Sequence, residues 1–469
     1  MKALKLLITI MIIGVFVVGC STNNSPGTTS SQEVKQEEAK PSTTTETASE
    51  TPTPEPTYDL KGQTVKLGVW WDGADPRTVA EKDRTPGTEE LIKLIEEAEK
   101  KYNCKIEYVK FGDYGKYVEN FTTTSLAGEP FADAVVLELF WAFPQLVNKG
   151  FITPIDQWLD MSDDKYIAWM KDGGSYNGKQ YGFIDAPPSP YGIFYNKTLV
   201  EQMGLEDPYT LQQSGEWTWD KFRELMKKAT KDTNGDGKTD VYGMTGAYEK
   251  TQMLAKQFIY TNKGTVADTV DGQMKFTMDQ ENAVSGLQFL SDLYNVDKSI
   301  MQPVPEDASK EFVAGKGVMY AGFSWEFSGL KDNMKDKELG YVFFPKGPKA
   351  DKYTSFTAYG NMYMISKYSK NAEATAHILS DISLGQKDKE FSVQSWQTNY
   401  PTPELVDTRT QMYDNISYMG GYYAVPDSGK LFEDAVNDIT ERKVAPATAV
   451  EKIKNPFEAG ISKLMSETK

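Results

Sequence analysis

Residues 176–205 read YNGKQYGFIDAPPSPYGIFYNKTLVEQMGL, and this stretch decides the fold. Its first part, residues 177–182, has the Asn-Gly chemistry of a tight turn between two extended runs. Residues 183–195 then alternate prolines with apolar residues, which favours an extended backbone over a helix. The stretch therefore predicts a chain that turns once and then crosses the molecule in an extended conformation.

The chain before this stretch alternates between two hydrophobic periods. Short apolar runs predict strands at residues 65–70, 106–111 and 134–139, and longer amphipathic runs predict helices at 86–102, 117–127 and 143–149. Such alternation is typical of an α/β fold with a mostly parallel sheet. Further helices are predicted from Thr218, at 280–294, at 371–383 and over 428–465, the last with breaks at Pro446 and Pro456.

The first 60 residues have the composition of an export signal followed by a tether. Lys2 and Lys5 precede an apolar run that is too short to span a membrane but suits a signal peptide, residues 1–19. The run ends in VVGC, which resembles a bacterial lipobox, so we expect Cys20 to carry a lipid. Residues 20–60 are rich in Ser, Thr, Pro and Glu and predict a disordered linker that holds the folded part at a membrane surface.

Composition narrows the classes of function. The net charge of −16 disfavours nucleic acid as a partner. Cys104 has no cysteine left to pair with once Cys20 is lipidated, and a buried, inert thiol is expected there. The chain has a single histidine, His377, which lies in an apolar helical pattern, so a nucleophile with a histidine base has little support.

Six segments in order resemble the maltodextrin-binding-protein-like family of extracellular solute-binding proteins (family 1). They are FADAVV at 131–136, LVNKGFITPID at 146–156, the opening stretch 176–205, WTWDKF at 217–222, FVAGKGVM at 312–319 and YMISKYSKN at 363–371. The resemblance covers essentially all of the chain from about residue 62.

This resemblance implies a two-lobe α/β fold of the periplasmic-binding-protein type II, with a hinge and a ligand cleft between the lobes. By analogy the N-lobe takes residues 62–186 and 362–398, and the C-lobe takes 187–361 and the C-terminal helices of 399–469. It also implies a monomer that delivers a carbohydrate to the permease subunits of an ABC importer. With the lipid anchor, the expected location is the outer face of the cell membrane of a Gram-positive bacterium.

Sugars are bound by aromatic faces and by polar side chains that reach their hydroxyls. The candidates lie where the resemblance places cleft loops: Trp70, Trp71, Asp72, Glu138, Trp141, Tyr191, Tyr248, Trp325, Glu326, Tyr359, Asn361, Tyr422 and Tyr423. Each aromatic could instead be a core residue. Trp70 and Trp71 are neighbours on a strand and face opposite ways, so we expect one of them in the cleft. Trp158, Trp217 and Trp219 are assigned to packing.

Residues 232–240, DTNGDGKTD, match the first nine positions of a calcium loop. Asp232, Asn234, Asp236 and Asp240 offer side-chain oxygens, and Lys238 would offer its carbonyl. The twelfth position is Gly243 instead of Glu, so a complete EF-hand is excluded. A structural calcium ion is expected here, and the alternative is a polar turn that needs no metal.

Other functions stay open at this point. A secreted glycan-active enzyme would need two carboxylates about 5 Å apart, which Asp72, Glu138 or Glu326 could supply. The same fold could also bind a non-sugar solute or act as a sensor.

Overall fold

A computed structural model describes residues 58–184, 186–270, 273–334 and 338–467, which all belong to one compact unit. The predicted signal peptide, Cys20 and the linker up to residue 57 lie outside the described residues. The last part of the predicted linker is wrong, because Tyr58 stacks on Tyr102 and His377, and Leu60 is buried. The folded part therefore begins by residue 58. No helix in the described ranges has the length and apolar character that crossing a membrane requires.

The first sheet has five strands in the order β2-β1-β3-β14-β6. They are β1 (Gln63–Val69), β2 (Cys104–Lys110), β3 (Ala134–Glu138), β6 (Gly182–Phe183) and β14 (Asn361–Ile365). β1 runs parallel to β2 and β3, as the strand-helix alternation predicted, whereas β14 runs antiparallel to β3. The part of the molecule built on this sheet is called the N-lobe below.

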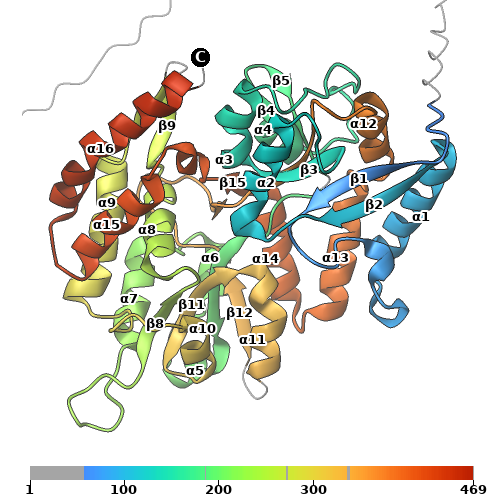
Figure 1. Ribbon diagram of the computed structural model, residues 1–469. Coiled ribbons are helices and arrows are strands. Elements are labelled where there is room, and N and C mark those ends of the chain that lie inside the picture. Colours follow the sequence, from blue (N-terminus) through green and yellow to red (C-terminus); the bar gives the residue numbers. More distant parts are fainter. Residues whose placement is uncertain (1–57, 185, 271–272, 335–337, 468–469) are drawn as a thin grey trace, which may run out of the picture. The chain divides into compact units, whose positions relative to one another are not determined.

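Helices cover the N-lobe sheet: α1 (Pro86–Lys101), α2 (Tyr114–Leu126), α4 (Ala168–Gly173) and α12 (Ala372–Asp381). α1 begins where the Thr85 hydroxyl accepts a hydrogen bond from the Thr88 N–H. Its buried stripe, Ile92, Ile95 and Ala98, repeats at helical spacing. Figure 1 shows α1 beside β2 and α12 above β1.

The second sheet has four strands in the order β12-β7-β11-β8 and defines the C-lobe. They are β7 (Tyr191–Asn196), β8 (Tyr242–Ala247), β11 (Gly317–Phe323) and β12 (Leu339–Val342). The main helices are α7 (Trp219–Ala229), α8 (Lys250–Tyr260), α9 (Glu281–Ser291), α15 (Ser428–Thr440) and α16 (Pro446–Glu467). β7 and β11 are buried along their whole length, which explains why both are apolar apart from Asn196 at the end of β7. Trp217 and Trp219 are buried in the C-lobe core, as predicted.

Shorter elements complete the C-lobe and its edges. They are α5 (Lys197–Gln202), α6 (Pro208–Ser214), β9 (Ala267–Val270), β10 (Gln273–Phe276), α10 (Ala308–Val313), η5 (Ser324–Glu326), α11 (Phe327–Asn333) and η6 (Gly421–Ala424). In the N-lobe, α3 (Leu139–Trp141) and η3 (Ala142–Leu146) follow β3 directly.

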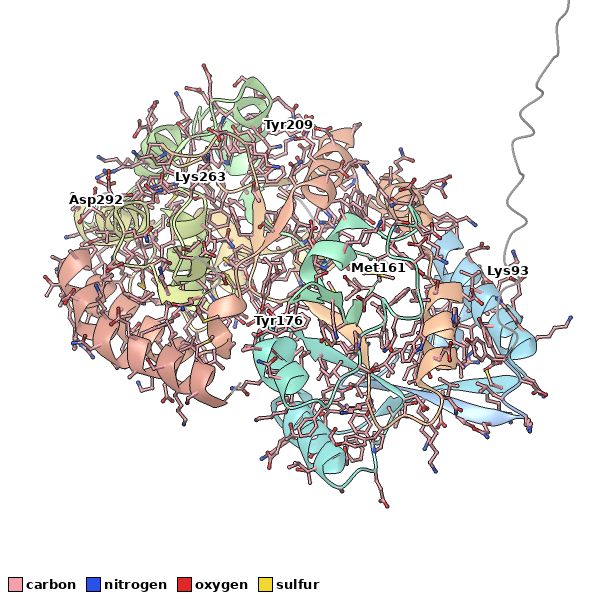
Figure 2. All side chains as sticks on the ribbon, turned by 90° about the horizontal axis from the view of Figure 1, so that it is seen from above. Lys93, Met161, Tyr176, Tyr209, Lys263 and Asp292 are labelled. Atoms are coloured by element: carbon pink, nitrogen blue, oxygen red, sulfur yellow. The ribbon has the colours of Figure 1, made fainter. Side chains whose placement is uncertain are left out.

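The chain passes between the two sheets more than once. It leaves the N-lobe between β6 and β7, and it returns between β13 (Ser355–Thr357) and β14. β13 pairs in parallel with β15 (Ile416–Tyr418). α13 (Lys387–Asn399) packs on α1, and α14 (Pro403–Asp414) packs on β12. Figure 2 shows Lys93 of α1 in the N-lobe and Asp292, which follows α9, in the C-lobe. The predicted two-lobe α/β fold is confirmed, because each sheet has its own apolar core.

One predicted helix break is wrong. Pro446 begins α16, but the helix continues through Pro456. Pro456 is exposed, while Ile453, Phe457 and Leu464 on the same helix are buried in the C-lobe core. Packing of this apolar stripe outweighs the loss of one backbone hydrogen bond at the proline.

Candidate functional site

Four aromatic side chains gather where β1 and β3 end and α2 begins. Trp70, Trp71, Tyr114 and Trp141 form this N-lobe aromatic cluster. The ring centroid of Trp70 lies 5.1 Å from Trp71, 5.4 Å from Tyr114 and 5.6 Å from Trp141, in each case edge to face. Trp71 and Tyr114 remain 39% and 38% exposed. Trp70 is the half-buried support of the cluster, because its ring also packs on the buried Tyr117.

A second group of rings lies where the parallel strands β8 and β11 of the C-lobe sheet end. Tyr248, Phe323, Trp325 and Tyr359 form this C-lobe aromatic cluster. Trp325 stacks on Phe323 with centroids 3.9 Å apart, and Tyr248 meets Trp325 edge to face at 5.9 Å. Trp325 is 52% exposed and Tyr248 is 39% exposed. Both clusters therefore present aromatic surface to solvent, supported from behind by buried rings.

Phe140 and Tyr423 bring the two lobes into contact. Phe140 follows β3 in the N-lobe, and its ring lies 5.4 Å from that of Tyr423 in η6. The approach of η6 depends on Gly420, because a Cβ there would lie 2.1 Å from the Ala358 carbonyl oxygen. Burial raises the pKa of Tyr114, and Glu138 of the N-lobe and Glu249 of the C-lobe raise it further. Groups from both lobes thus lie within electrostatic reach of one phenol.

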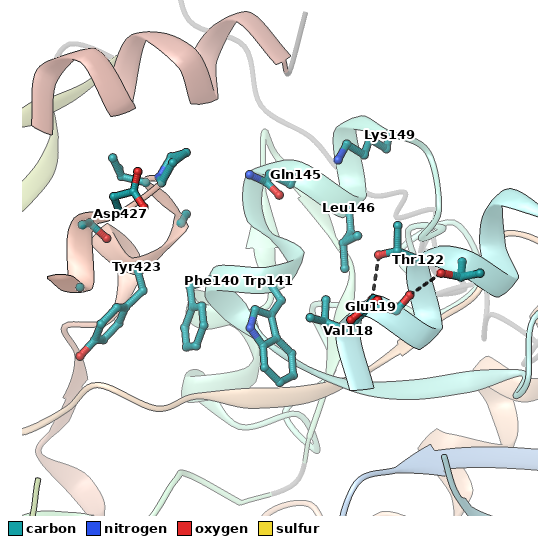
Figure 3. Close-up of a pocket in the computed structure, with 16 residues that line it drawn as sticks. Val118, Glu119, Thr122, Phe140, Trp141, Gln145, Leu146, Lys149, Tyr423 and Asp427 are labelled. Carbon is teal, nitrogen blue, oxygen red and sulfur yellow. Dashed lines mark hydrogen bonds between the residues drawn. The ribbon is translucent and has the colours of Figure 1, made fainter. Parts of the chain in front are cut away.

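A cavity of about 490 Å³ opens beside this contact. Figure 3 shows Gln145, Leu146 and Lys149 on one side of the cavity, Tyr423 and Asp427 on the other, and Phe140 and Trp141 between them. Helix α2 adds Val118, Glu119 and Thr122 to the lining. A concave space between two lobes, with aromatic rings and a few polar groups, is typical of a small-molecule site.

Glu138 ends β3 beneath the N-lobe aromatic cluster and is only 2% exposed. Its carboxylate accepts a hydrogen bond of 3.0 Å from the Gly360 N–H, on the segment that returns from the C-lobe. Burial raises the pKa of Glu138 to about 7, although the Gly360 N–H and the Asn361 side chain both lower it. Glu138 therefore joins the N-lobe sheet to the crossing segment.

On the C-lobe side, the carboxylate of Glu249 binds Tyr359, the residue that precedes Gly360 on the crossing segment. The Tyr359 hydroxyl donates a hydrogen bond to Glu249. Lys256 lies 3.9 Å from the other carboxylate oxygen of Glu249 and donates a 2.7 Å hydrogen bond to the Tyr423 hydroxyl. These four side chains connect α8, the crossing segment and η6 in one polar network.

Comparison with known proteins assigns the chain to a family. The model of the family described as "Bacterial extracellular solute-binding protein" matches residues 83–378, which is more than half of the chain. The chain belongs to this family. The fold of this solute-binding protein, and the solute capture outside the cytoplasm that defines the family, agree with the resemblance found in the sequence.

Solved structures with the same fold include several binding proteins. One is a cyclo/maltodextrin-binding protein complexed with maltotetraose (17% identity, TM-score 0.64, covering 85% of this chain and 97% of that one). Another is the ABC substrate-binding protein Lmo0181 of Listeria monocytogenes in complex with cycloalternan (17%, TM-score 0.62, 86% and 99%). A third is UgpB of Mycobacterium tuberculosis in complex with glycerophosphocholine (16%, TM-score 0.62, 86% and 99%). At such identities the likeness shows the fold alone.

Several predicted site residues of the solute-binding protein do lie together. Trp70, Trp71 and Trp141 belong to the N-lobe cluster, and Tyr248, Trp325 and Tyr359 belong to the C-lobe cluster. Glu138 and Asn361 are paired across β3 and β14. Tyr423 stands at the contact between the lobes.

Four predicted site residues lie elsewhere. Tyr191 is fully buried and donates its hydroxyl to the Ala321 carbonyl, because β7 has neighbours on both sides. Tyr422 is 1% exposed and stacks between Tyr423 and Phe432. Glu326 turns inward and accepts from the Tyr320 hydroxyl and the Phe323 N–H. Asp72 is highly exposed and pairs with Lys110 instead of joining a cluster.

Sequence reasoning missed five members of the site: Tyr114, Phe140, Glu249, Lys256 and Phe323. Lys256 was the clearest signal in the sequence, because it is the one charged residue between Met253 and Ile259. Glu249 and Lys250 both adopt left-handed backbone, with φ of 58°, which is rare outside glycine. Sequence does not reveal that conformation.

The predicted calcium loop uses its oxygens internally. Asp232 accepts from the N–H groups of Asn234, Gly235 and Gly237, and Asp240 accepts from Thr233 and Asn234. Asp236 accepts from the Lys238 N–H. Within the described ranges, no three acidic, histidine or cysteine side chains gather as metal ligands. The oxygen donors suit calcium chemically, but the carboxylates are not assembled around one point, so calcium binding stays a prediction.

The carboxylates that a glycan-active enzyme would need are engaged in three different places. Asp72 binds Lys110, Glu138 binds the Gly360 N–H, and Glu326 binds Tyr320. His377 stacks on Tyr58. These contacts link none of the three carboxylates to another, and the family is one of binding proteins.

Proposed function

We propose that this solute-binding protein captures an oligosaccharide between its two aromatic clusters. The observation that carries the proposal is the exposure of Trp71 and Tyr114 on one lobe and of Tyr248 and Trp325 on the other. Single exposed apolar residues are ordinary, but an exposed aromatic cluster on each lobe, supported from behind by buried rings, needs an explanation. Aromatic faces stack on the C–H faces of sugar rings, and the partly exposed Glu249 and Tyr423 supply hydrogen bonds to hydroxyls.

Closure of the lobes would complete the site. The crossing segment bonds to Glu138 of the N-lobe through Gly360 and to Glu249 of the C-lobe through Tyr359. A hinge motion about this segment brings the two clusters toward one solute while each lobe keeps its own core. The bound complexes of structural relatives, with maltotetraose and cycloalternan, support an oligosaccharide as the solute here.

We further propose that the protein serves an ABC importer from the outer face of the membrane. Support comes from the family and from the predicted lipid attachment at Cys20. The protein should incorporate radiolabelled palmitate, and a Cys20→Ala change should abolish this incorporation. Equal palmitate incorporation by Cys20→Ala would refute the anchor.

Thermal unfolding of residues 58–469 against neutral oligosaccharides, monosaccharides and glycerophosphocholine tests the solute class. A solute that binds only the folded protein raises the melting temperature in a saturable way. A rise with an oligosaccharide and no hydrolysis product supports the proposal. A rise in melting temperature with glycerophosphocholine alone would show that the solute is a phosphodiester instead of a sugar. Release of a hydrolysis product would indicate an enzyme.

A further inference from the structure

Lys256 is the only buried lysine among the described residues, with 1% of its surface exposed. Lysine is almost never buried without a partner, because desolvation of its ammonium group is costly. Helix α8 carries it on a turn where Met253, Leu254 and Phe258 face the C-lobe core. The partners of this ammonium group therefore decide what it does.

Those partners are a hydroxyl and a carboxylate at the solute site. The Lys256 Nζ donates to the Tyr423 hydroxyl at 2.7 Å and lies 5.2 Å from the centroid of the same ring. It lies 3.9 Å from Glu249, the residue that directly precedes α8. The ring that Lys256 holds is the one that meets Phe140 of the opposite lobe.

A solute can reach the carboxylate of Glu249 but not the ammonium group of Lys256. One third of the Glu249 side chain is exposed, whereas 1% of the Lys256 side chain is. Around the adjoining cavity, Glu119 and Asp427 outnumber Lys149. A solute entering between the lobes therefore meets carboxylates and phenols, and the buried ammonium group balances Glu249 from behind.

We infer that Lys256 is a positioning residue that fixes Tyr423 and neutralises Glu249, so that the site takes uncharged saccharides and rejects their acidic counterparts. The inference rests on the proposed function. Rejection follows because an acidic sugar would place its carboxylate beside the exposed part of Glu249, while the ammonium group that balances Glu249 is buried out of its reach. The strained backbone of Glu249 and Lys250 supports the same reading, since such strain persists where the surrounding structure needs a particular side-chain position.

The matched probes are the neutral oligosaccharide that gives the largest thermal shift and its C6-oxidised uronate form, titrated by calorimetry. We expect the wild type to bind the uronate form at least about 10-fold more weakly. Glu249→Gln keeps the hydrogen-bond acceptor for Tyr359 but leaves Lys256 unbalanced, so the acidic-to-neutral affinity ratio should rise by about 10-fold. A purely structural role would weaken both sugars equally. Glu201→Gln, an exposed change of the same charge on α5, is the control and should leave the ratio unchanged.

Equal binding of both sugar forms by the wild type, or an unchanged ratio in Glu249→Gln, would overturn the inference while leaving saccharide capture intact. Failure of every saccharide to bind would refute the proposed function and the selectivity with it. The positioning network has a readout that needs no solute. Lys256→Met should lower the melting temperature, and the double variant Lys256→Met with Glu249→Gln should recover part of the loss, because it removes the unpaired charge. A double variant no more stable than Lys256→Met would refute the pairing.

Discussion

The ring of Trp325 lies on the ring of Phe323 with centroids 3.9 Å apart and an angle of 11° between their planes. One face of the indole is thus fixed by a fully buried phenylalanine, while half of the side chain stays accessible. A ring held in this way can stack on a sugar without losing side-chain freedom on binding, which lowers the entropic cost of association.

Trp325→Ala should therefore weaken oligosaccharide binding by about 2 kcal/mol, or roughly 30-fold, and change the melting temperature of the free protein little. Calorimetric titration measures the first effect and thermal unfolding the second. Tyr368→Ala is the matched control, because Tyr368 is 40% exposed but follows the end of β14 that lies away from Glu138. Equal affinities for wild type and Trp325→Ala would remove Trp325 from the site.

A change at Trp217 should lower the stability of the protein and leave its affinity for the solute unchanged. Trp217 is fully buried and donates a 2.7 Å hydrogen bond from its indole N–H to the Phe343 carbonyl. Trp217→Phe leaves that carbonyl without its donor and opens a small cavity, which should cost about 1–3 kcal/mol in the free energy of unfolding. Urea unfolding measures this loss. Affinity for the solute should be unchanged in the folded variant, and a large loss of affinity would contradict the assignment of Trp217 to packing.

Glu138 predicts how stability depends on pH. Burial raises its pKa from 4.5 to about 7 in the folded protein, so between these values the folded state binds more protons than the unfolded chain. The contribution of Glu138 is therefore fully present below about pH 4.5 and is lost as pH rises through about 7, with a total of about 3 kcal/mol. Glu138→Gln resembles the protonated form and should lack this dependence.

The measurement is the difference in unfolding free energy between Glu138→Gln and wild type from pH 5 to 8. The difference cancels the groups that both proteins share, and it should grow in favour of the variant as pH rises. A difference that is constant with pH would mean that Glu138 is ionised throughout this range.

The loop at 232–240 gives a prediction that can be settled without a structure. If calcium binds, millimolar calcium should raise the melting temperature relative to a chelator, because a ligand of the folded state adds stability. Asp232→Asn combined with Asp236→Asn should abolish the rise, and magnesium should not reproduce it. Identical melting curves with calcium and with chelator would leave the loop as a turn held by its own Asp side chains.

The fold could be predicted from the sequence further than the site could. The strands β1, β2 and β3 have short apolar runs, and parallel strands end at a common edge, so Trp71, Trp141 and the Glu138 carboxylate were found there. Burial of individual side chains was not predictable in the same way. Tyr191 and Tyr422 lie in segments that resemble cleft loops, yet their rings point into the C-lobe core.

The site residues that the sequence analysis missed were missed for a different reason. The role of Lys256 depends on Glu249 and Tyr423, which are brought to it by a left-handed backbone and by the close approach of η6 at Gly420. These are tertiary relationships between residues up to 174 positions apart, between Glu249 and Tyr423. Periodicity within one helix marks Lys256 as unusual but does not name its partners.

The central position of β14 in the N-lobe sheet has a consequence for biogenesis. This strand lies between β3 and β6, but it is encoded by residues 361–365, after the sheet of the other lobe has been specified. During synthesis and export the amino-terminal half must wait, with an unfilled gap between two of its strands, until the distant segment emerges. The lobe that is made first therefore stays incomplete until the sheet of the other lobe has been made, and chaperones of the secretion route would meet it with open strand edges in that interval.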